Sequence, residues 1–219
     1  MSILDLLISE EEERDRANII NGVAIGIVSD NKDPENMGRV KLKFPWLSNE
    51  DVTDWVRIAT FMAGGSRGSY FLPEVGDEVL VAFDHGDINH PYIIGALWNK
   101  DDQPPENNSD GENNIRQIRS RSGHKITLDD KSGKEKIEII SKAGHKIVLD
   151  DSAGQEKIEI IDKTGSNSIK IDSVQNSIAI ESSMKLSIKS TMIEIESSGM
   201  MTIKASGVLT IQGSLVKIN

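Results

Sequence analysis

The chain has 219 residues, no cysteine and a formal net charge of -10. This length allows one large or two small domains, and the missing cysteines exclude a disulfide framework and a cysteine-based metal site. The acidic balance argues against a nucleic-acid partner, since phosphate contacts need clustered Lys and Arg. The first eight residues lack a basic segment, so we expect folding in the cytoplasm without a signal peptide.

Composition changes near the middle of the chain. All aromatic residues lie at or before Trp98, and all prolines lie at or before Pro105. Residues 1–116 hold 22 acids and 10 bases, whereas residues 117–219 hold 13 acids and 15 bases. We therefore expect two architectures, separated by a polar linker over 99–116 that contains Pro104 and Pro105.

Residues 1–18 are predicted to form a short helix or arm, capped by Ser2 and ending in a solvated acidic run. Residues 19–98 show short alternating segments separated by turn signals, at 23–28, 39–44, 55–59, 78–83 and 92–97. About five short strands within one small domain predict a closed or partly closed barrel. The glycine-rich segment 63–69 is expected to be a loop.

The barrel motifs resemble those of phage baseplate assembly protein V and of the valine–glycine-repeat spikes of type VI secretion. The resemblance rests on ordered motifs across 19–98, above all the run from Leu72 to Phe83, and it implies an oligonucleotide/oligosaccharide-binding (OB) barrel. We interpret the motif residues as fold-keeping: Gly38, Arg39, Trp55, Pro73, Glu74, Gly76, Asp77, Gly86, Asp87 and Gly95.

Residues 117–219 show self-similarity. The segments 122–140 and 143–161 align with a period of 21 residues, and a degenerate third copy begins at Gly165. Beyond Ile169, apolar pairs two residues apart recur, which is strand periodicity. One such stripe cannot bury itself, so we expect chains to pair around one axis as a triple-stranded, intertwined β-helix. The axis would be lined by Ile180, Ile188, Ile195, Ile203, Ile211 and Ile218.

Several residues are candidates for catalytic or metal-binding sites. The pairs Asp129–Asp130 and Asp150–Asp151 repeat with the 21-residue period and are interpreted as exposed turn acids. His124 and His145 also repeat and are expected to face water, while His85 and His90 lack an evident third metal ligand. The segment Gly64–Ser69 lacks the ending of a phosphate loop. We therefore expect no catalytic, cofactor or metal site.

The resemblance also implies a function and partners. We expect a non-enzymatic central spike of a contractile injection system or phage-like tail baseplate, which joins a trimeric hub to the needle tip and punctures the target membrane. Its partners would be two further copies, a separate hub protein and a PAAR-repeat-like tip protein bound at Leu215, Val216 and Ile218. Such a spike would reside in the baseplate and be driven outward on contraction.

Two other functions stay open. A trimeric receptor-binding fibre or adhesin would also be β-helical, although the barrel motif counts against it. A glycan-degrading enzyme would need a groove with aromatic residues and paired acids, and the second half of the chain has no aromatic residue.

Overall fold

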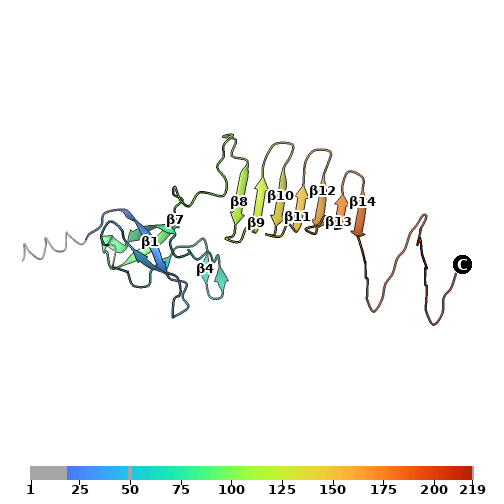
Figure 1. Ribbon diagram of the computed structural model, residues 1–219, viewed down its shortest axis with the longest axis horizontal. Coiled ribbons are helices and arrows are strands. Elements are labelled where there is room, and N and C mark those ends of the chain that lie inside the picture. The colour runs from blue at the N-terminus through green and yellow to red at the C-terminus, as the bar shows by residue number, and fades with distance from the viewer. Residues whose placement is uncertain (1–18, 49–50, 219) are drawn as a thin grey trace, which may run out of the picture. The chain divides into compact units, whose positions relative to one another are not determined.

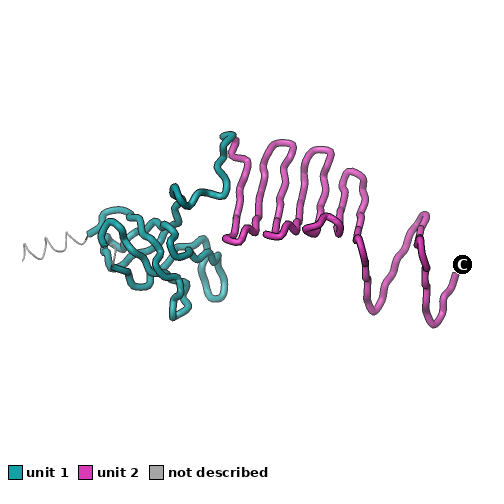
Figure 2. Tube along the Cα trace, viewed as in Figure 1, with its two compact units in different colours: residues 1–111 teal, residues 112–219 magenta. Residues whose placement is uncertain are grey.

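The computed structural model describes residues 19–48 and 51–218, which fall into two compact units, 1–111 and 112–219 (Figure 2). The helix expected over residues 1–18 lies outside the described residues. The all-β fold class is confirmed, because the described residues hold fourteen strands and a single three-residue 3-10 helix, η1 (Asp84–Gly86).

The first unit is built on a five-stranded sheet with the order β2-β1-β6-β7-β3 (Figure 1). All neighbours are antiparallel except β3 and β7. The strands are β1 (Val23–Asp30), β2 (Lys41–Lys43), β3 (Arg57–Ile58), β6 (Glu78–Phe83) and β7 (Pro91–Ala96). Val40 and Val56 exchange two backbone hydrogen bonds of 3.1 and 2.8 Å just ahead of β2 and β3. This bridge links the two outer strands, so the sheet closes into a small barrel.

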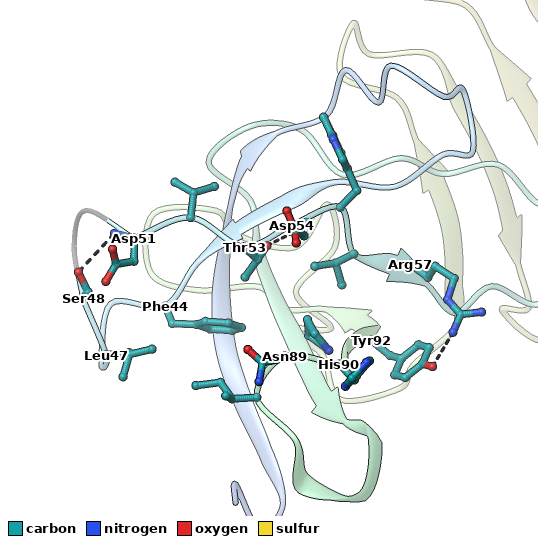
Figure 3. A pocket seen from close by; sticks show the side chains of 15 residues that line it. Phe44, Leu47, Ser48, Asp51, Thr53, Asp54, Arg57, Asn89, His90 and Tyr92 are labelled. Carbon is teal, nitrogen blue, oxygen red and sulfur yellow. Dashed lines mark hydrogen bonds between the residues drawn. The ribbon is translucent and has the colours of Figure 1, made fainter. Parts of the chain in front are cut away.

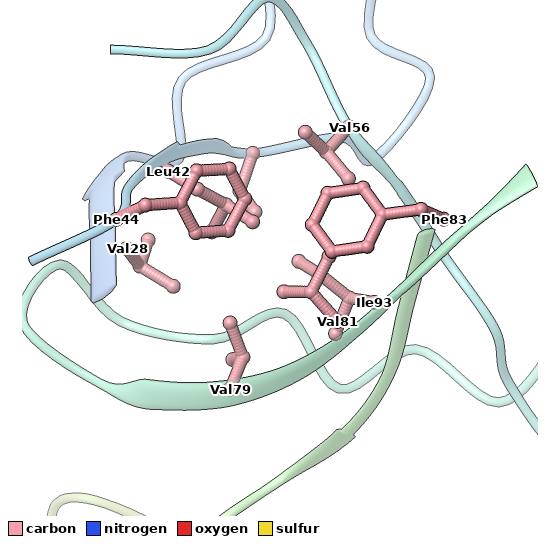
Figure 4. Packing of buried hydrophobic residues seen from close by; sticks show 9 residues of the cluster. Val28, Leu42, Phe44, Val56, Val79, Val81, Phe83 and Ile93 are labelled. Atoms are coloured by element: carbon pink, nitrogen blue, oxygen red, sulfur yellow. The ribbon is translucent and has the colours of Figure 1, made fainter. Parts of the chain in front are cut away.

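The barrel core is a single cluster of apolar side chains (Figure 4). Strand β6 shows why the sequence folds this way, since Val79, Val81 and Phe83 alternate inward and are buried while their neighbours are partly exposed. Gly26 on β1 faces the same interior. A Cβ atom there would lie 3.3 Å from atoms of Leu42, Phe44 and Val81, so a side chain at this position would force these neighbours to shift by a few tenths of an ångström.

The segment expected to be a loop over 63–69 is instead a hairpin of β4 (Ala63–Gly64) and β5 (Arg67–Gly68). Its two-residue turn is Gly65–Ser66, and Ser66 has a φ of 56°, in the left-handed region. Glycines signal turns without saying whether the flanking residues pair, which explains the difference.

The second unit is a seven-stranded antiparallel sheet in which each strand pairs with the next one along the chain (Figure 1). The strands are β8 (Ile115–Arg119), β9 (Lys125–Asp129), β10 (Lys136–Ile140), β11 (Lys146–Asp150), β12 (Lys157–Ile161), β13 (Asn167–Asp172) and β14 (Ser177–Ser182). Each 21-residue repeat is thus two strands and two turns. Gly123, Gly144 and Gly165 recur in one set of turns with φ values of 97°, 94° and 73°.

Residues 183–218 follow β14 as an extended zigzag without assigned strands (Figure 1). Over 115–182 the strand partners lie in the same chain, whereas the apolar pattern led us to expect partners in other chains. The alternation of side chains along a strand is identical in both cases, so it cannot distinguish them.

Candidate functional site

The first motif of the barrel is a loop held by Asp33 and Arg39. The Arg39 guanidinium donates two hydrogen bonds of 2.9 Å to the two carboxylate oxygens of Asp33. The same carboxylate accepts backbone N–H groups from Glu35, Met37 and Arg39 at 3.0 to 3.3 Å. These donors, led by Arg39, hold the pKa of Asp33 well below its usual range. Gly38 turns the loop at a φ of 70°, so this motif fixes the backbone ahead of β2.

The second motif is the turn from Pro73 to Asp77. The Glu74 N–H donates to the Asp77 carboxylate at 2.9 Å, and the Asp77 N–H donates to the Glu74 carbonyl at 3.1 Å. Gly76 has a φ of 101°, and its N–H donates to the Val28 carbonyl at 2.9 Å. The turn is therefore hydrogen-bonded to β1, which is a structural role.

The third motif closes the β6–β7 connection. The Gly86 carbonyl accepts the Ile20 N–H at 2.8 Å, and Gly86 has a φ of 85°. Asp87 accepts the Asn89 N–H at 2.9 Å and lies 2.8 Å from the His90 ring, and the Asn89 bond leads the causes that lower the pKa of Asp87. These contacts order the loop around its own backbone.

Two further motif residues sit on the strands and their flanks. Trp55 lies under the Lys41 ammonium group, which is 5.3 Å from its ring centre. Gly95 pairs with Leu80 beside an irregularity of the β6–β7 register. Both contribute contacts within the barrel.

A cavity of about 600 Å³ opens on the barrel between the segment before β3 and the start of β7 (Figure 3). Arg57 stacks on Tyr92 at 4.7 Å and donates a hydrogen bond to its hydroxyl. The Thr53 hydroxyl accepts the Leu42 N–H and donates to the Asp54 carbonyl. Arg57, Tyr92 and Thr53 thus have structural partners within the barrel, and His85 is almost fully exposed elsewhere. Within 19–48 and 51–218, no three His, Cys, Asp or Glu side chains form a metal-binding group.

The second unit presents one apolar sheet face. Cross-strand pairing aligns isoleucines and leucines into two ladders, one running from Leu128 to Ile178 and one from Ile118 to Ile180. Their exposed fractions range from 38% to 72%, so a single chain leaves this face in water. The members are Ile118, Ile126, Leu128, Ile137, Ile139, Ile147, Leu149, Ile158, Ile160, Ile169, Ile171, Ile178 and Ile180. A continuous apolar surface of this kind marks an interface.

The opposite face of the sheet is polar and ordered by charge. Asp129, Lys136, Asp150, Lys157 and Asp172 follow one another across neighbouring strands, so acids and bases alternate. Opposite charges directly across an antiparallel pair stabilise it, and like charges would destabilise it. The apolar face is therefore the side that the sheet must cover.

The repeated acids and histidines have contacts within the sheet. Asp130 accepts a hydrogen bond from Arg116, and Asp150 accepts the Ser152 N–H at 3.0 Å. The His124 and His145 rings are exposed, as expected for residues facing water, and their Nδ1 atoms accept backbone N–H groups of the next repeat at 3.2 Å. Sequence reasoning missed this histidine role, although the shared 21-residue spacing was its signal.

The residues proposed for an axis and a tip are all exposed in the single chain. Ile180 lies in β14, while Ile188, Ile195, Ile203, Ile211 and Ile218 lie in the extended segment, with exposed fractions from 53% to 89%. The tip residues Leu215 and Val216 are 73% and 46% exposed. The structure thus brings the axis candidates to no common core within one chain.

Comparison with known proteins defines the class of the first unit. Residues 24–98 match the family model of the type VI secretion system/phage-baseplate injector OB domain. The barrel described above is therefore an injector OB domain.

Two spike proteins are similar to about half of the chain. The chain is 34% identical over 111 residues to the type VI secretion system spike protein VgrG3 of Vibrio cholerae, which covers 47% of the chain and 11% of that protein. It is 32% identical over 136 residues to the spike protein VgrG1b of Pseudomonas aeruginosa, covering 55% of the chain and 18% of that protein. These matches support a baseplate V/VgrG family for the domain at residues 24–98.

The similarity covers a small part of these relatives, since the chain spans between a tenth and a fifth of their length. Another relative, 32% identical over 108 residues, is the actin cross-linking toxin VgrG1 of Vibrio cholerae. No helix among the described residues is long and apolar enough to cross a membrane.

Proposed function

We propose that the protein is the structural central spike of a contractile injection system or phage-like tail baseplate. The observation that carries the proposal is the uncovered apolar face of the second unit, which follows an injector OB domain in the same chain. The relatives named as spike proteins support it. The barrel motifs serve the fold, and the relatives named as spike proteins support a mechanical, non-enzymatic role.

The exposed apolar face supports assembly as a homotrimer. Each of its isoleucines and leucines keeps more than a third of its surface exposed in one chain. Three such sheets arranged as a prism would turn their apolar faces to one axis and their charged faces to water. Burying this surface supplies the main driving force for association.

The extended segment 183–218 needs backbone hydrogen-bond partners from other chains. Its apolar residues continue the strand alternation, with Ile188, Ile195, Ile203 and Ile211 all more than half exposed. Extended backbone away from water requires hydrogen-bond partners, and this segment has no strand partner among the described residues of its own chain. In the trimer, three such segments would pair with one another and intertwine along the axis.

The partners of the trimer follow from its two ends. The barrel end would join a baseplate hub protein, and Leu215, Val216 and Ile218 would bind a PAAR-repeat-like tip protein. A rigid, preformed apolar platform loses little entropy on binding, which favours such a cap. The assembled needle would reside in the baseplate and contact the target membrane transiently when it is driven outward.

The test of the tip contact is co-expression with the PAAR-like protein encoded beside this gene. We expect the intact chain to retain the tip protein through purification and a chain lacking residues 212–219 to lose it. A matched control carries Ser214→Ala, which leaves the apolar residues in place. Equal capture by the intact and shortened chains would place the contact elsewhere, and no capture by the intact chain would contradict the proposed tip partner.

A further inference from the structure

The turns of the second unit lie in two rows, one at each end of the strands (Figure 2). Each row of turns forms one edge of the sheet. We call residues 119–125, 140–146 and 161–168 the basic turn row, because they hold six bases and one acid. We call residues 129–136, 150–157 and 172–177 the acidic turn row, because they hold seven acids and four bases. The sheet is therefore polarised in charge from one edge to the other.

Both rows repeat at the same interval. Arg121, Lys142 and Lys163 recur every 21 residues in the basic turn row, and Asp130 and Asp151 recur with the same period in the acidic one. Each period advances two strands, which is about 9.6 Å along the sheet. The turns of the two rows alternate along the chain. Along the direction in which the strands are stacked, each acidic turn therefore lies between the positions of two basic turns.

Single-chain contacts leave part of this charge without a partner. Lys142, Lys163 and Asp151 are exposed or partly exposed, and none of them forms an ion pair with a described residue of its own chain. Asp162, the acid of the basic turn row, is held inside its turn by Thr164 and by the backbone of Ser166 and Asn167. A complementary surface would thus meet mainly positive charge on one edge and mainly negative charge on the other.

We propose that the basic turn row of each chain packs against the acidic turn row of the next chain around the needle axis. The inference rests on the proposed trimer. A cyclic arrangement of three sheets with inward apolar faces necessarily brings one edge of each sheet to the opposite edge of its neighbour. The repeated acids of the acidic turn row then help to select the neighbouring chain and its direction.

Lys142 and Asp151 provide a sharp test, because they cannot interact within one chain. Strand β11 (Lys146–Asp150) separates them, and its five residues span about 16 Å at roughly 3.3 Å per residue. This exceeds the screening length of about 8 Å at physiological salt. Any energetic coupling between the two positions therefore reports a contact between chains.

The experiment compares the full chain with Lys142→Glu, Asp151→Lys and the double variant, by the rate of urea-induced trimer dissociation at 50 mM NaCl. We expect each single variant to dissociate about eightfold faster. Loss of one exposed contact changes the rate roughly twofold, and the trimer contains three equivalent contacts between chains. The double variant restores opposite charges at this contact and should dissociate clearly more slowly than the about 64-fold acceleration that two independent effects would give. Lys100→Glu, which makes the same charge change within the first unit, serves as the control.

The outcomes distinguish the proposed trimer from the proposed contact between the two turn rows. If the unchanged chain sediments as a monomer, the proposed trimer fails. If it is a trimer but the double variant dissociates about 64-fold faster, the effects merely multiply and the edge contact is overturned. Rates that stay unchanged in both single variants would overturn it as well. In the expected case, 500 mM NaCl should shrink the differences among the variants.

Discussion

Replacing Ile160 with Asp should weaken the trimer through the apolar face. Ile160 lies between Ile147 and Ile169 on the neighbouring strands and is 48% exposed in the single chain. Covering this remaining half of the side chain contributes about 1 kcal/mol per chain, so about 3 kcal/mol per trimer. This corresponds to about a hundredfold in the association constant, and an uncompensated buried carboxylate adds to the loss.

The neighbouring Ile161 supplies a matched control. It lies in the same strand, β12, but its side chain points to the opposite, polar face. We expect Ile160→Asp to shift the sedimentation profile toward the monomer at micromolar concentration, whereas Ile161→Asp stays assembled. Equal behaviour of the two variants, whether both assembled or both dissociated, would refute the assignment of the apolar face to the trimer interior.

Three other predictions concern the remaining parts of the molecule. Asp33→Asn should lower the melting temperature of the barrel and flatten its acid sensitivity. Because folding depresses the pKa of Asp33, the stability from its carboxylate is present above about pH 4 and is lost as the pH falls toward that depressed value, so a melting series from pH 2 to 6 would measure the loss. Gly86→Ala should cost at least about 1 kcal/mol in urea unfolding, because a Cβ would lie 2.9 Å from Ile19 Cγ2 at a left-handed φ of 85°; an unchanged midpoint would contradict this. Incubation with peptidoglycan and common polysaccharides should give no turnover above buffer, and cleavage that disappears on changing Asp129 or Asp150 would contradict a purely structural role.

The barrel was largely predictable because its signals are local. The alternation in β6 and the turn residues from Pro73 to Asp77 indicate strands and bends without knowledge of distant contacts. The partners of those residues were not predictable. Nothing in the sequence pairs Gly76 with Val28 or places Arg39 on both oxygens of Asp33, since these contacts depend on the closed sheet.

In the second unit, the repeat was predictable from the sequence but the pairing of its strands was not. The 21-residue period predicted the repeat and the apolar stripe, but not that β8 to β14 pair within one chain. The charge ladder from Asp129 to Asp172 was also hidden, because its members are neighbours only once the strand register is known. Likewise, the repeat places His124 and His145 in equivalent turns, but their role as acceptors depends on how closely the next repeat approaches.

The most direct measurement is the mass of the full chain in solution by sedimentation equilibrium at micromolar concentration. A spike whose apolar sheet faces and extended segments meet on one axis should have a mass three times the 24.1 kDa of the chain, and should keep it on tenfold dilution. A stable monomer of 24.1 kDa would contradict the trimeric needle, since the exposed isoleucines would then face water in the native protein.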